Sequence, residues 1–424
     1  MKGSLAPYTV GELHIKMNNL ITSGRSVAVA VLEDRRRYVA GSDAGFLPDV
    51  RVVVGCIAKC LTATLLARYM STSSLGMRDQ VPDVLCLASS SAREVLEGVE
   101  FAHLLNHTHG LDDADIDFDA VPRRYDGSID VDVLCAKLGE APRLGEPGEI
   151  YSYGGTGSWL IAAYLEQQFG CGYLEILRSE LLDPLGIMIA PGIEEHGICP
   201  AWGGELALSA VDLIKFLRPN LPENGVAAQT GFRLLREGKV AMPGWCPWQH
   251  AATCGWNVYG RNWLGHSGNR DGTGIALRFH RSKPLAIAIT AKREADCLFA
   301  LATLFGEVLE EFSGDYVRIP RTLDPDSWNA KDPSRLLGSY ENARWRIHIA
   351  KSARSGFLRM RVFDRRTLSS GSILDRHLRA AENDVFLAVP HGFDYPFVQF
   401  IGGETETMHA TYLWNGRQLW RFVG

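Results

Sequence analysis

The feature that most constrains this chain is a run from Cys56 to Ser74 that contains neither proline nor glycine. Most of its residues are apolar and it is longer than a typical strand, so it predicts a buried α-helix. Cys56 starts this run, and Lys59 follows three residues later. Residues at i and i+3 share one face of a helix, so the two side chains are expected to converge on one point.

A cysteine in the first turn of a helix meets unpaired backbone N–H groups and the positive end of the helix dipole, which favour a thiolate. The ammonium of Lys59 favours it further. Cys56 and Lys59 are therefore the parts of an activated covalent nucleophile. The alternative is a cysteine that only packs the core, with a lysine nearby by chance, because cysteine is among the most buried residue types.

Length and charge bound the kind of protein. At 424 residues the chain is too long for one simple core, so two domains are expected. The net charge is −5 without a long basic run, which argues against nucleic acid or a membrane surface as a partner. No apolar stretch has the length of a membrane span, and the first residues lack the apolar core of a secretion signal. We expect a cytoplasmic protein that acts on small molecules, and the sequence does not indicate its oligomeric state.

The nine cysteines are scattered without C-x-x-C pairs, which is typical of reduced thiols rather than of a disulfide framework or a zinc site. The main candidate metal ligands are His103, His107 and His109, because two histidines at i and i+4 can share a metal on a helix. The first histidine is not followed by the glutamate of a catalytic zinc helix, so structural histidines are favoured. No metal and no cofactor is predicted.

Two β-like regions far apart in the sequence predict one antiparallel sheet. Residues 26–32 and 37–40 flank a polar turn, and residues 273–279 and 285–290 do the same later in the chain. The stretch between them, about residues 77–222, is helix-rich with many glycine and proline turns. We predict an α+β fold in which helices flank the sheet and a helical insertion forms a subdomain.

The last part of the chain predicts a separate all-β domain. Residues 321–335 are polar and contain two prolines, which is typical of a linker. In residues 336–424 apolar and polar residues alternate, and Asn415-Gly416 is a strong signal for a two-residue hairpin. We therefore predict a catalytic domain over residues 1–320 and a small barrel or sandwich over residues 336–424.

Four segments, in order and spacing, resemble the serine β-lactamase and penicillin-binding-protein superfamily, in its branch of class C β-lactamases, esterases and acyltransferases. They resemble its S-x-x-K element with cysteine for serine, its H-L-L-x-H-T-S-G-L segment, its P-G-x-x-F-x-Y-S-N-x-G segment and the H-x-G form of its K-T-G element. The segments are Gly55–Lys59, His103–Leu111, Glu146–Gly157 and Gly265–Gly268. The resemblance covers roughly residues 10–315 and implies a β-lactamase/transpeptidase-like fold, and the C-terminal part resembles the small barrel appended to many members.

The resemblance implies a catalytic set. Cys56 would attack a carbonyl and form an acyl-enzyme, and Lys59 would hold or relay its proton. Tyr153 would be the general base, with its pKa lowered by Lys59, and later the acid for the leaving group. His266 would supply a weaker, pH-dependent positive charge where an ammonium often sits in this superfamily.

The resemblance also implies how the substrate is held. The backbone N–H groups of Cys56 and Asn269 would form an oxyanion hole. Gly155, Ser267 and Gly268 would line the substrate-binding site. Five tryptophans precede His266 and are candidates to shape the pocket, although tryptophan is more often simply buried. They are Trp202, Trp245, Trp248, Trp256 and Trp263.

Two departures from the superfamily pattern point to a changed activity. Gly155 stands where the Y-x-N element has an asparagine that orients the lysine and contacts the substrate, which argues against β-lactam or peptidoglycan recognition and leaves more room. Cys56 replaces serine, so the intermediate becomes a thioester, which favours amines over water. We therefore predict an acyltransferase or transamidase with a small-molecule acyl donor and an amine acceptor, in specialised metabolism such as antibiotic biosynthesis. The alternatives are a cysteine esterase or amidase, and a catalytically inactive binding protein.

Overall fold

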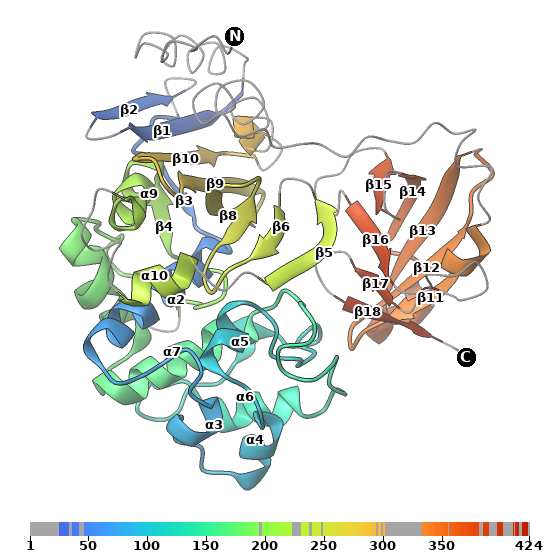
Figure 1. Ribbon diagram of the computed structural model, residues 1–424, viewed down its shortest axis with the longest axis horizontal. Helices are drawn as coiled ribbons and strands as arrows, with labels where there is room; N and C mark the ends of the chain where they lie inside the picture. The colour runs from blue at the N-terminus through green and yellow to red at the C-terminus, as the bar shows by residue number, and fades with distance from the viewer. Residues whose placement is uncertain are drawn as a thin grey trace, which may run out of the picture.

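The computed structural model shows a sheet covered by helices and, beside it, a β-barrel (Figure 1). It describes most of the chain. The described residues are 25–33, 36–41, 46–194, 197–222, 230–236, 240–246, 249–293, 296–297, 300–301, 333–354, 356–380, 385–389, 397–401, 410, 412–414 and 418–422. The predicted linker lies mostly outside them, although Pro333–Leu336 form a short 3-10 helix before the barrel.

The central sheet is antiparallel and joins the two ends of the first part of the chain. Its strands are β1 (Val27–Glu33), β2 (Arg36–Gly41), β5 (Val240–Cys246), β6 (Gln249–Ala252), β7 (Asn257–Tyr259), β8 (Trp263–Arg270), β9 (Thr273–His280) and β10 (Leu285–Ala291). Among the described strands the order is β2-β1-β10-β9-β8-β7-β6-β5. On β1, Val29 pairs with Ile289 of β10 and with Ala40 of β2. The predicted union of the two β-like regions is confirmed.

The insertion between the two halves of the sheet is mostly helical. Its longer elements are α2 (Ile57–Thr72), α3 (Val81–Val84), α4 (Ser90–Val95), α5 (Phe101–Leu105), α6 (Val131–Leu138), α7 (Thr156–Phe169), α8 (Tyr173–Ile176), the π-helix η2 (Leu177–Leu182), α9 (Ala210–Leu217) and α10 (Thr230–Arg236). Helix α9 packs on β1 and β10, whereas α3 to α7 form the lower helical region of Figure 1. A two-stranded sheet, β3 (Arg51–Val53) with β4 (Ala207–Ser209), was not predicted, and β3 leads directly into the segment that carries Cys56.

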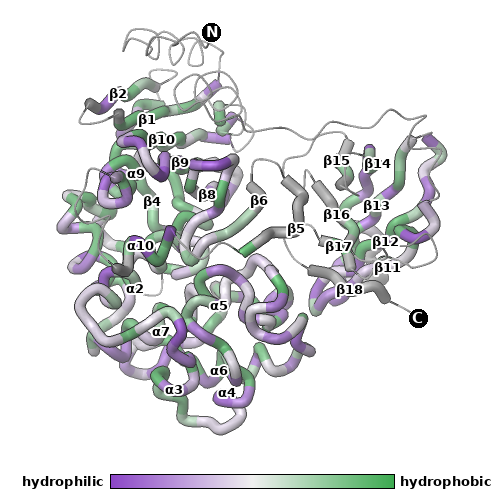
Figure 2. Tube along the Cα trace, in the orientation of Figure 1, coloured by the Kyte–Doolittle hydropathy of each residue, from purple (hydrophilic) through white to green (hydrophobic). Residues whose placement is uncertain are grey.

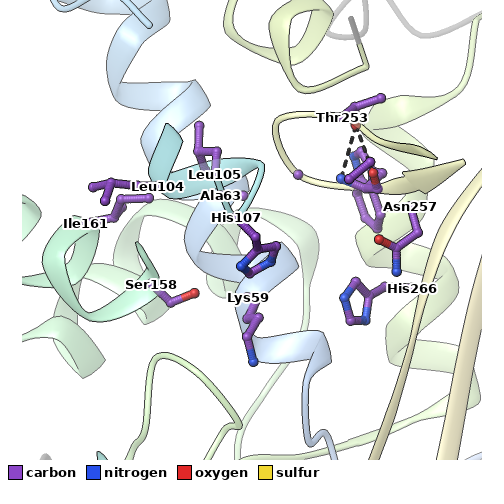
Figure 3. A pocket seen from close by; sticks show the side chains of 13 residues that line it. Lys59, Ala63, Leu104, Leu105, His107, Ser158, Ile161, Thr253, Asn257 and His266 are labelled. Carbon is purple, nitrogen blue, oxygen red and sulfur yellow. Dashed lines mark hydrogen bonds between the residues drawn. The ribbon is translucent and has the colours of Figure 1, made fainter. Parts of the chain in front are cut away.

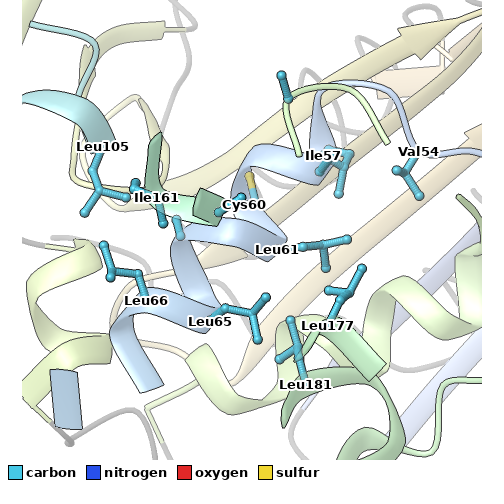
Figure 4. Packing of buried hydrophobic residues seen from close by; sticks show 14 of the residues in the cluster. Val54, Ile57, Cys60, Leu61, Leu65, Leu66, Leu105, Ile161, Leu177 and Leu181 are labelled. Atoms are coloured by element: carbon cyan, nitrogen blue, oxygen red, sulfur yellow. The ribbon is translucent and has the colours of Figure 1, made fainter. Parts of the chain in front are cut away.

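Helix α2 runs through the middle of the hydrophobic core, which explains why its sequence is apolar all round. Cys60, Leu61 and Leu66 have no exposed surface, and Leu65 is buried beside them. They pack against Ile161 of α7 and the leucines of η2 (Figure 4). Strands β1 and β10 are hydrophobic along their lengths for the same reason, since both faces of the sheet are covered (Figure 2).

The C-terminal part is a closed barrel rather than a sandwich. Its strands are β11 (Gly338–Glu341), β12 (Trp345–Lys351), β13 (Phe357–Asp364), β14 (Leu374–Ala380), β15 (Val385–Val389), β16 (Phe397–Ile401), β17 (Tyr412–Trp414) and β18 (Gln418–Phe422). Closure comes from the pairing of β11 with β18, which leaves no open edge. Trp414 pairs with Gln418 across the predicted hairpin, whose Asn415-Gly416 turn lies outside the described residues. The predicted α+β fold with an additional C-terminal β domain is confirmed.

Candidate active site

The start of α2 lies against the edge of β8, and two glycines allow the close approach. Gly55 has φ +54°, in the left-handed region that favours glycine, and a Cβ there would lie 2.6 Å from the Asn269 carbonyl oxygen. A Cβ on Gly268 would lie 2.6 Å from the Val54 carbonyl oxygen and 3.0 Å from the Cys56 nitrogen. The fold therefore brings the Cys56 segment and the Gly265–Gly268 segment into direct backbone contact.

Cys56 is the N-cap of α2 and is partly exposed to solvent. The Cys56 carbonyl accepts a hydrogen bond from the N–H of Lys59, at 3.1 Å. In the part of the chain that the structure describes, the N–H of Cys56 itself donates to no carbonyl. A substrate oxygen placed between Cys56 and the adjoining Asn269 backbone could accept a hydrogen bond from the Cys56 N–H, as the predicted oxyanion hole requires.

Lys59 lies on the same face of α2 as Cys56 and is 6% exposed. Its ammonium donates a 2.7 Å hydrogen bond to the carbonyl of Ala201. The same ammonium lies 4.7 Å from the centre of the Tyr153 ring and 4.4 Å from the Trp202 ring. The cation therefore contacts the ring faces of two aromatic side chains, an arrangement that the sequence did not indicate.

Tyr153 is buried next to Cys56, and its hydroxyl makes no hydrogen bond of ordinary geometry with the described chain. Burial raises the pKa of Tyr153 well above its usual value, and the neighbouring Cys56 sulfur raises it further. This direction is opposite to the one expected from Lys59, because the ammonium lies against the ring of Tyr153. In the resting site Tyr153 is therefore a neutral phenol, which can donate a proton but cannot begin as a phenolate base.

His266 is a buried, neutral imidazole. Its Nδ1 lies 2.7 Å from the Ser267 carbonyl oxygen, so Nδ1 carries the proton and Nε2 is left as an acceptor. Burial, followed by the positive charge of Lys59, lowers the pKa of His266 to about 3. The expectation that His266 supplies a pH-dependent positive charge is therefore wrong at physiological pH, where its imidazole is neutral. The ring lies 5.9 Å from that of Tyr153, centre to centre.

A second buried cation, Arg278 of β9, holds the His266 segment from behind. It donates to the His266 carbonyl at 2.9 Å and to the Ser267 hydroxyl at 3.1 Å, and it lies over the Tyr259 ring at 3.7 Å. The Ser267 side chain thus contacts Arg278, and its predicted contact with substrate stays a prediction. An arginine in the otherwise apolar strand Thr273–Phe279 is the signal in the sequence that could have identified this residue.

Gly155 does not open the site as expected, because Phe118 occupies the space beside it. A Cβ on Gly155 would lie 2.7 Å from the Phe118 ring. Phe118 packs edge-to-face on Trp202, with ring centres 5.3 Å apart, and stacks on Trp159 at 6.3 Å. Asp113 accepts the Gly155 N–H at 2.7 Å and fixes the backbone. The expectation of more room is therefore wrong.

His107 lies in the site, although the sequence favours a structural role for it. Its ring lies 4.7 Å from that of Tyr153, and its Nδ1 accepts a long hydrogen bond from the Gly154 N–H at 3.4 Å. His107, Lys59 and His266 line one narrow cavity (Figure 3). His107 also has φ +61°, an unusual backbone conformation for a residue with a side chain. His103 and His109 instead accept backbone N–H groups, at 3.1 Å each.

A cleft of about 570 Å³ lies beside the segment that leads into Cys56. Three of its lining residues connect it to the site. Val53 comes shortly before Cys56 in the sequence, and Arg270 directly follows Asn269. Phe118 contacts Gly155. Trp159 and the charged Arg123 and Glu205 also line the cleft. Of the five tryptophans, Trp202 meets Lys59, whereas Trp256 and Trp263 are buried in hydrophobic clusters. The side chains of Trp245 and Trp248 lie outside the described residues.

The described residues contain neither a candidate metal site nor a helix that could span a membrane. Among the described residues, no three His, Cys, Asp or Glu side chains are placed to hold one metal ion. Within the same residues, none of the helices combines the length and the apolarity needed to cross a membrane.

Comparisons with known proteins agree with this architecture. A family model described as beta-lactamase matches residues 19–304. Penicillin-binding protein 4 of Amycolatopsis lactamdurans is 26% identical in an alignment of length 383 that covers 80% of this chain and 92% of that protein.

Three solved structures illustrate the shared fold. The structure of SurE with D-Leu covers 97% of this chain and all of its own, with 22% identity and a TM-score of 0.69. The octameric penicillin-binding protein homologue from Pyrococcus abyssi covers the same shares, with 17% identity and a TM-score of 0.54. A class C β-lactamase covers 72% of this chain and 99% of its own, with 14% identity and a TM-score of 0.55.

Proposed function

Because this chain belongs to the beta-lactamase family, we propose that it is a cysteine-dependent acyltransferase, with Cys56 as the nucleophile. The acyl group comes from an ester or thioester donor, forms a thioester with Cys56 and passes to an amine. The observation that carries this proposal is the placement of Cys56 at the start of α2, with Lys59 on the same helix face and the neutral Tyr153 beside the sulfur. These are the parts that nucleophilic catalysis on a carbonyl needs.

In the acylation step, the Cys56 sulfur bonds to the carbonyl carbon and the bond from that carbon to the leaving group breaks. The negative charge on the carbonyl oxygen is held by the backbone N–H groups of Cys56 and Asn269. Tyr153 gives its phenolic proton to the leaving alcohol or thiol and receives the proton of the Cys56 thiol. The raised pKa of Tyr153 suits this shuttle, since the phenol starts and ends each step protonated.

In the transfer step, the amine nitrogen bonds to the thioester carbon and the carbon–sulfur bond breaks. Tyr153 takes a proton from the amine nitrogen and gives its own to the departing sulfur, which restores the thiol. His266 accepts a hydrogen bond at Nε2 and orients polar groups without adding charge, because its pKa is about 3. A thioester reacts with amines in preference to water more than an oxygen ester does, so the cysteine suits transfer rather than hydrolysis.

We propose that the substrates belong to specialised small-molecule metabolism, such as antibiotic biosynthesis. The names of the similar proteins guide the choice of donor, since one was solved with D-Leu and another is named for binding penicillin. We propose a donor whose reacting carbonyl belongs to a D-configured amino acid residue. The cleft between Phe118 and Arg270 is the proposed site for that residue.

The test is intact-protein mass after brief exposure to D-aminoacyl esters and thioesters, with L-aminoacyl and simple acyl donors for comparison. Wild type, Cys56→Ala and Tyr153→Phe are each run with and without a pool of amines. We expect an acyl adduct that requires Cys56, forms more slowly in Tyr153→Phe and clears faster with amine to give an amide.

Other outcomes would decide against acyl transfer. An adduct that clears equally fast in water alone would make the protein a cysteine esterase or amidase. No adduct with any donor, together with a Cys56 that alkylates no faster than the exposed Cys86, would indicate a binding protein without catalysis.

A further inference from the structure

The lysine of the site is held by aromatic rings where the superfamily pattern places an asparagine. The Lys59 ammonium lies 4.4 Å from the centre of the Trp202 ring and 4.7 Å from that of Tyr153. Its hydrogen bond to the Ala201 carbonyl comes from the residue next to Trp202. The segment Ala201-Trp202 therefore contacts the ammonium twice, through a backbone oxygen and a ring face.

The space for an asparagine side chain is closed by the same group of rings. Gly155 has φ −100° and ψ −23°, a conformation that any residue can adopt, so its backbone does not demand glycine. The obstacle is Phe118, whose ring atoms lie 2.7 to 3.0 Å from where a Cβ would be. Phe118 packs edge-to-face on Trp202, with an angle of 76° between the rings. The loss of the asparagine and the presence of Trp202 on the lysine are thus parts of one packing arrangement.

A ring face is an effective partner for a buried ammonium. Lys59 is 6% exposed, so it has lost most of the water that would stabilise its charge. A desolvated cation gains more from the face of a tryptophan than from that of any other aromatic side chain. A neutral ring also adds no negative charge to compete with a thiolate for the ammonium, as a carboxylate would.

We propose that Trp202 is a positioning residue that keeps the Lys59 ammonium charged and directed at Cys56, in the role that asparagine has in the superfamily pattern. The inference rests on the proposed function only in taking Cys56 as the nucleophile. It predicts that the reactivity of the Cys56 thiol depends on Trp202 even when no acyl donor is present.

The experiment measures the rate of Cys56 alkylation by iodoacetamide across pH, read by peptide mass, with the exposed Cys86 as the reference in the same molecule. The variants are Trp202→Leu, which fills space without a π-face, and Trp202→Phe, which keeps one. The matched control is Phe357→Leu, which removes the ring that lies 4.2 Å from Arg354 in the barrel. Circular dichroism and thermal melting verify that each variant is folded.

We expect Trp202→Leu to slow Cys56 alkylation roughly tenfold at neutral pH and to move the inflection of its pH profile upward. Trp202→Phe should recover most of the rate, and Phe357→Leu should match wild type. The proposal is overturned if folded Trp202→Leu has the wild-type rate and profile, or if Trp202→Phe is as slow as Trp202→Leu. The alkylation assay uses no acyl donor, so it tests this inference separately from the proposed function. If Trp202→Leu slows alkylation but wild type transfers no acyl group, only the proposed function is refuted.

Discussion

The backbone N–H of Ala343, in the barrel, donates a 2.7 Å hydrogen bond to Oδ2 of Asp112, in the part of the chain that carries Cys56. The next residue, Asp113, accepts the N–H groups of Gly155 and Thr156 at 2.7 and 3.0 Å. Two adjacent carboxylates therefore connect the barrel to the segment that carries Tyr153. Arg366 of the barrel adds an ion pair with Asp115 on the same loop. The barrel thus supports one wall of the site.

The link through Asp112 predicts that the barrel contributes to catalysis. Asp112→Ala leaves the Ala343 N–H without its acceptor in a site where Asp112 is 6% exposed. We expect a loss of about 1–3 kcal/mol in the free energy of unfolding, together with slower acyl transfer. Asp375→Ala is the control, because it breaks an exposed ion pair with Arg359 in the barrel and should cost less than about 1 kcal/mol. Equal stability and activity in Asp112→Ala and wild type would mean that the contact is incidental.

The neutral state of His266 predicts that the protein loses stability in acid. The pKa of His266 is about 3 in the folded protein against 6.5 for the free side chain, so the unfolded chain binds the extra proton between these values. This stability is fully present above about pH 6.5 and falls as the pH drops toward 3. The expected loss from this group between pH 7 and pH 5 is about 2 kcal/mol.

Urea unfolding at the two pH values, in wild type and His266→Gln, measures that loss. His107, whose pKa burial also lowers, remains in both proteins and cancels in the comparison. We expect wild type to lose about 2 kcal/mol more than His266→Gln between the two pH values. Parallel losses in the two proteins would show that His266 is not held neutral.

The contact between Gly155 and Phe118 predicts a specific non-additivity. Gly155→Asn should destabilise the protein by about 1–3 kcal/mol, because the new Cβ meets the Phe118 ring. In a Phe118→Ala background the same substitution should cost little, since the obstructing ring is gone. A double-mutant cycle by chemical denaturation measures the coupling. Additive costs would show that Phe118 does not fill the asparagine position.

Local patterns were sufficient to predict the helix after Cys56 and strands β1, β2, β9 and β10 of the sheet, although not the β3–β4 pair. The apolar run after Cys56 predicted α2, and the strands flanking residues 280–284 lie where their pattern placed them. The four motif segments come together as the resemblance implied, since Gly55 and Gly268 permit contact between two of them.

The electrostatics of the site could not be predicted in the same way. The positions of Phe118 beside Gly155 and of Trp202 over Lys59 are tertiary contacts between segments with no shared local pattern. The protonation states of Tyr153 and His266 depend on burial, which a motif does not specify. The spacing of Cys56, Lys59 and Tyr153 therefore indicated the chemistry, whereas the direction of each pKa shift required the structure.

The most direct test of the central claim is how the acyl-enzyme partitions between amine and water in wild type and Cys56→Ser. Both proteins are given the same D-aminoacyl thioester and the same amine, and the amide and the free acid are quantified together. We expect wild type to form mainly amide, and Cys56→Ser to shift the ratio toward acid by about tenfold. An equal ratio in the two proteins, or mainly acid from wild type, would contradict the assignment of Cys56 as a nucleophile for acyl transfer.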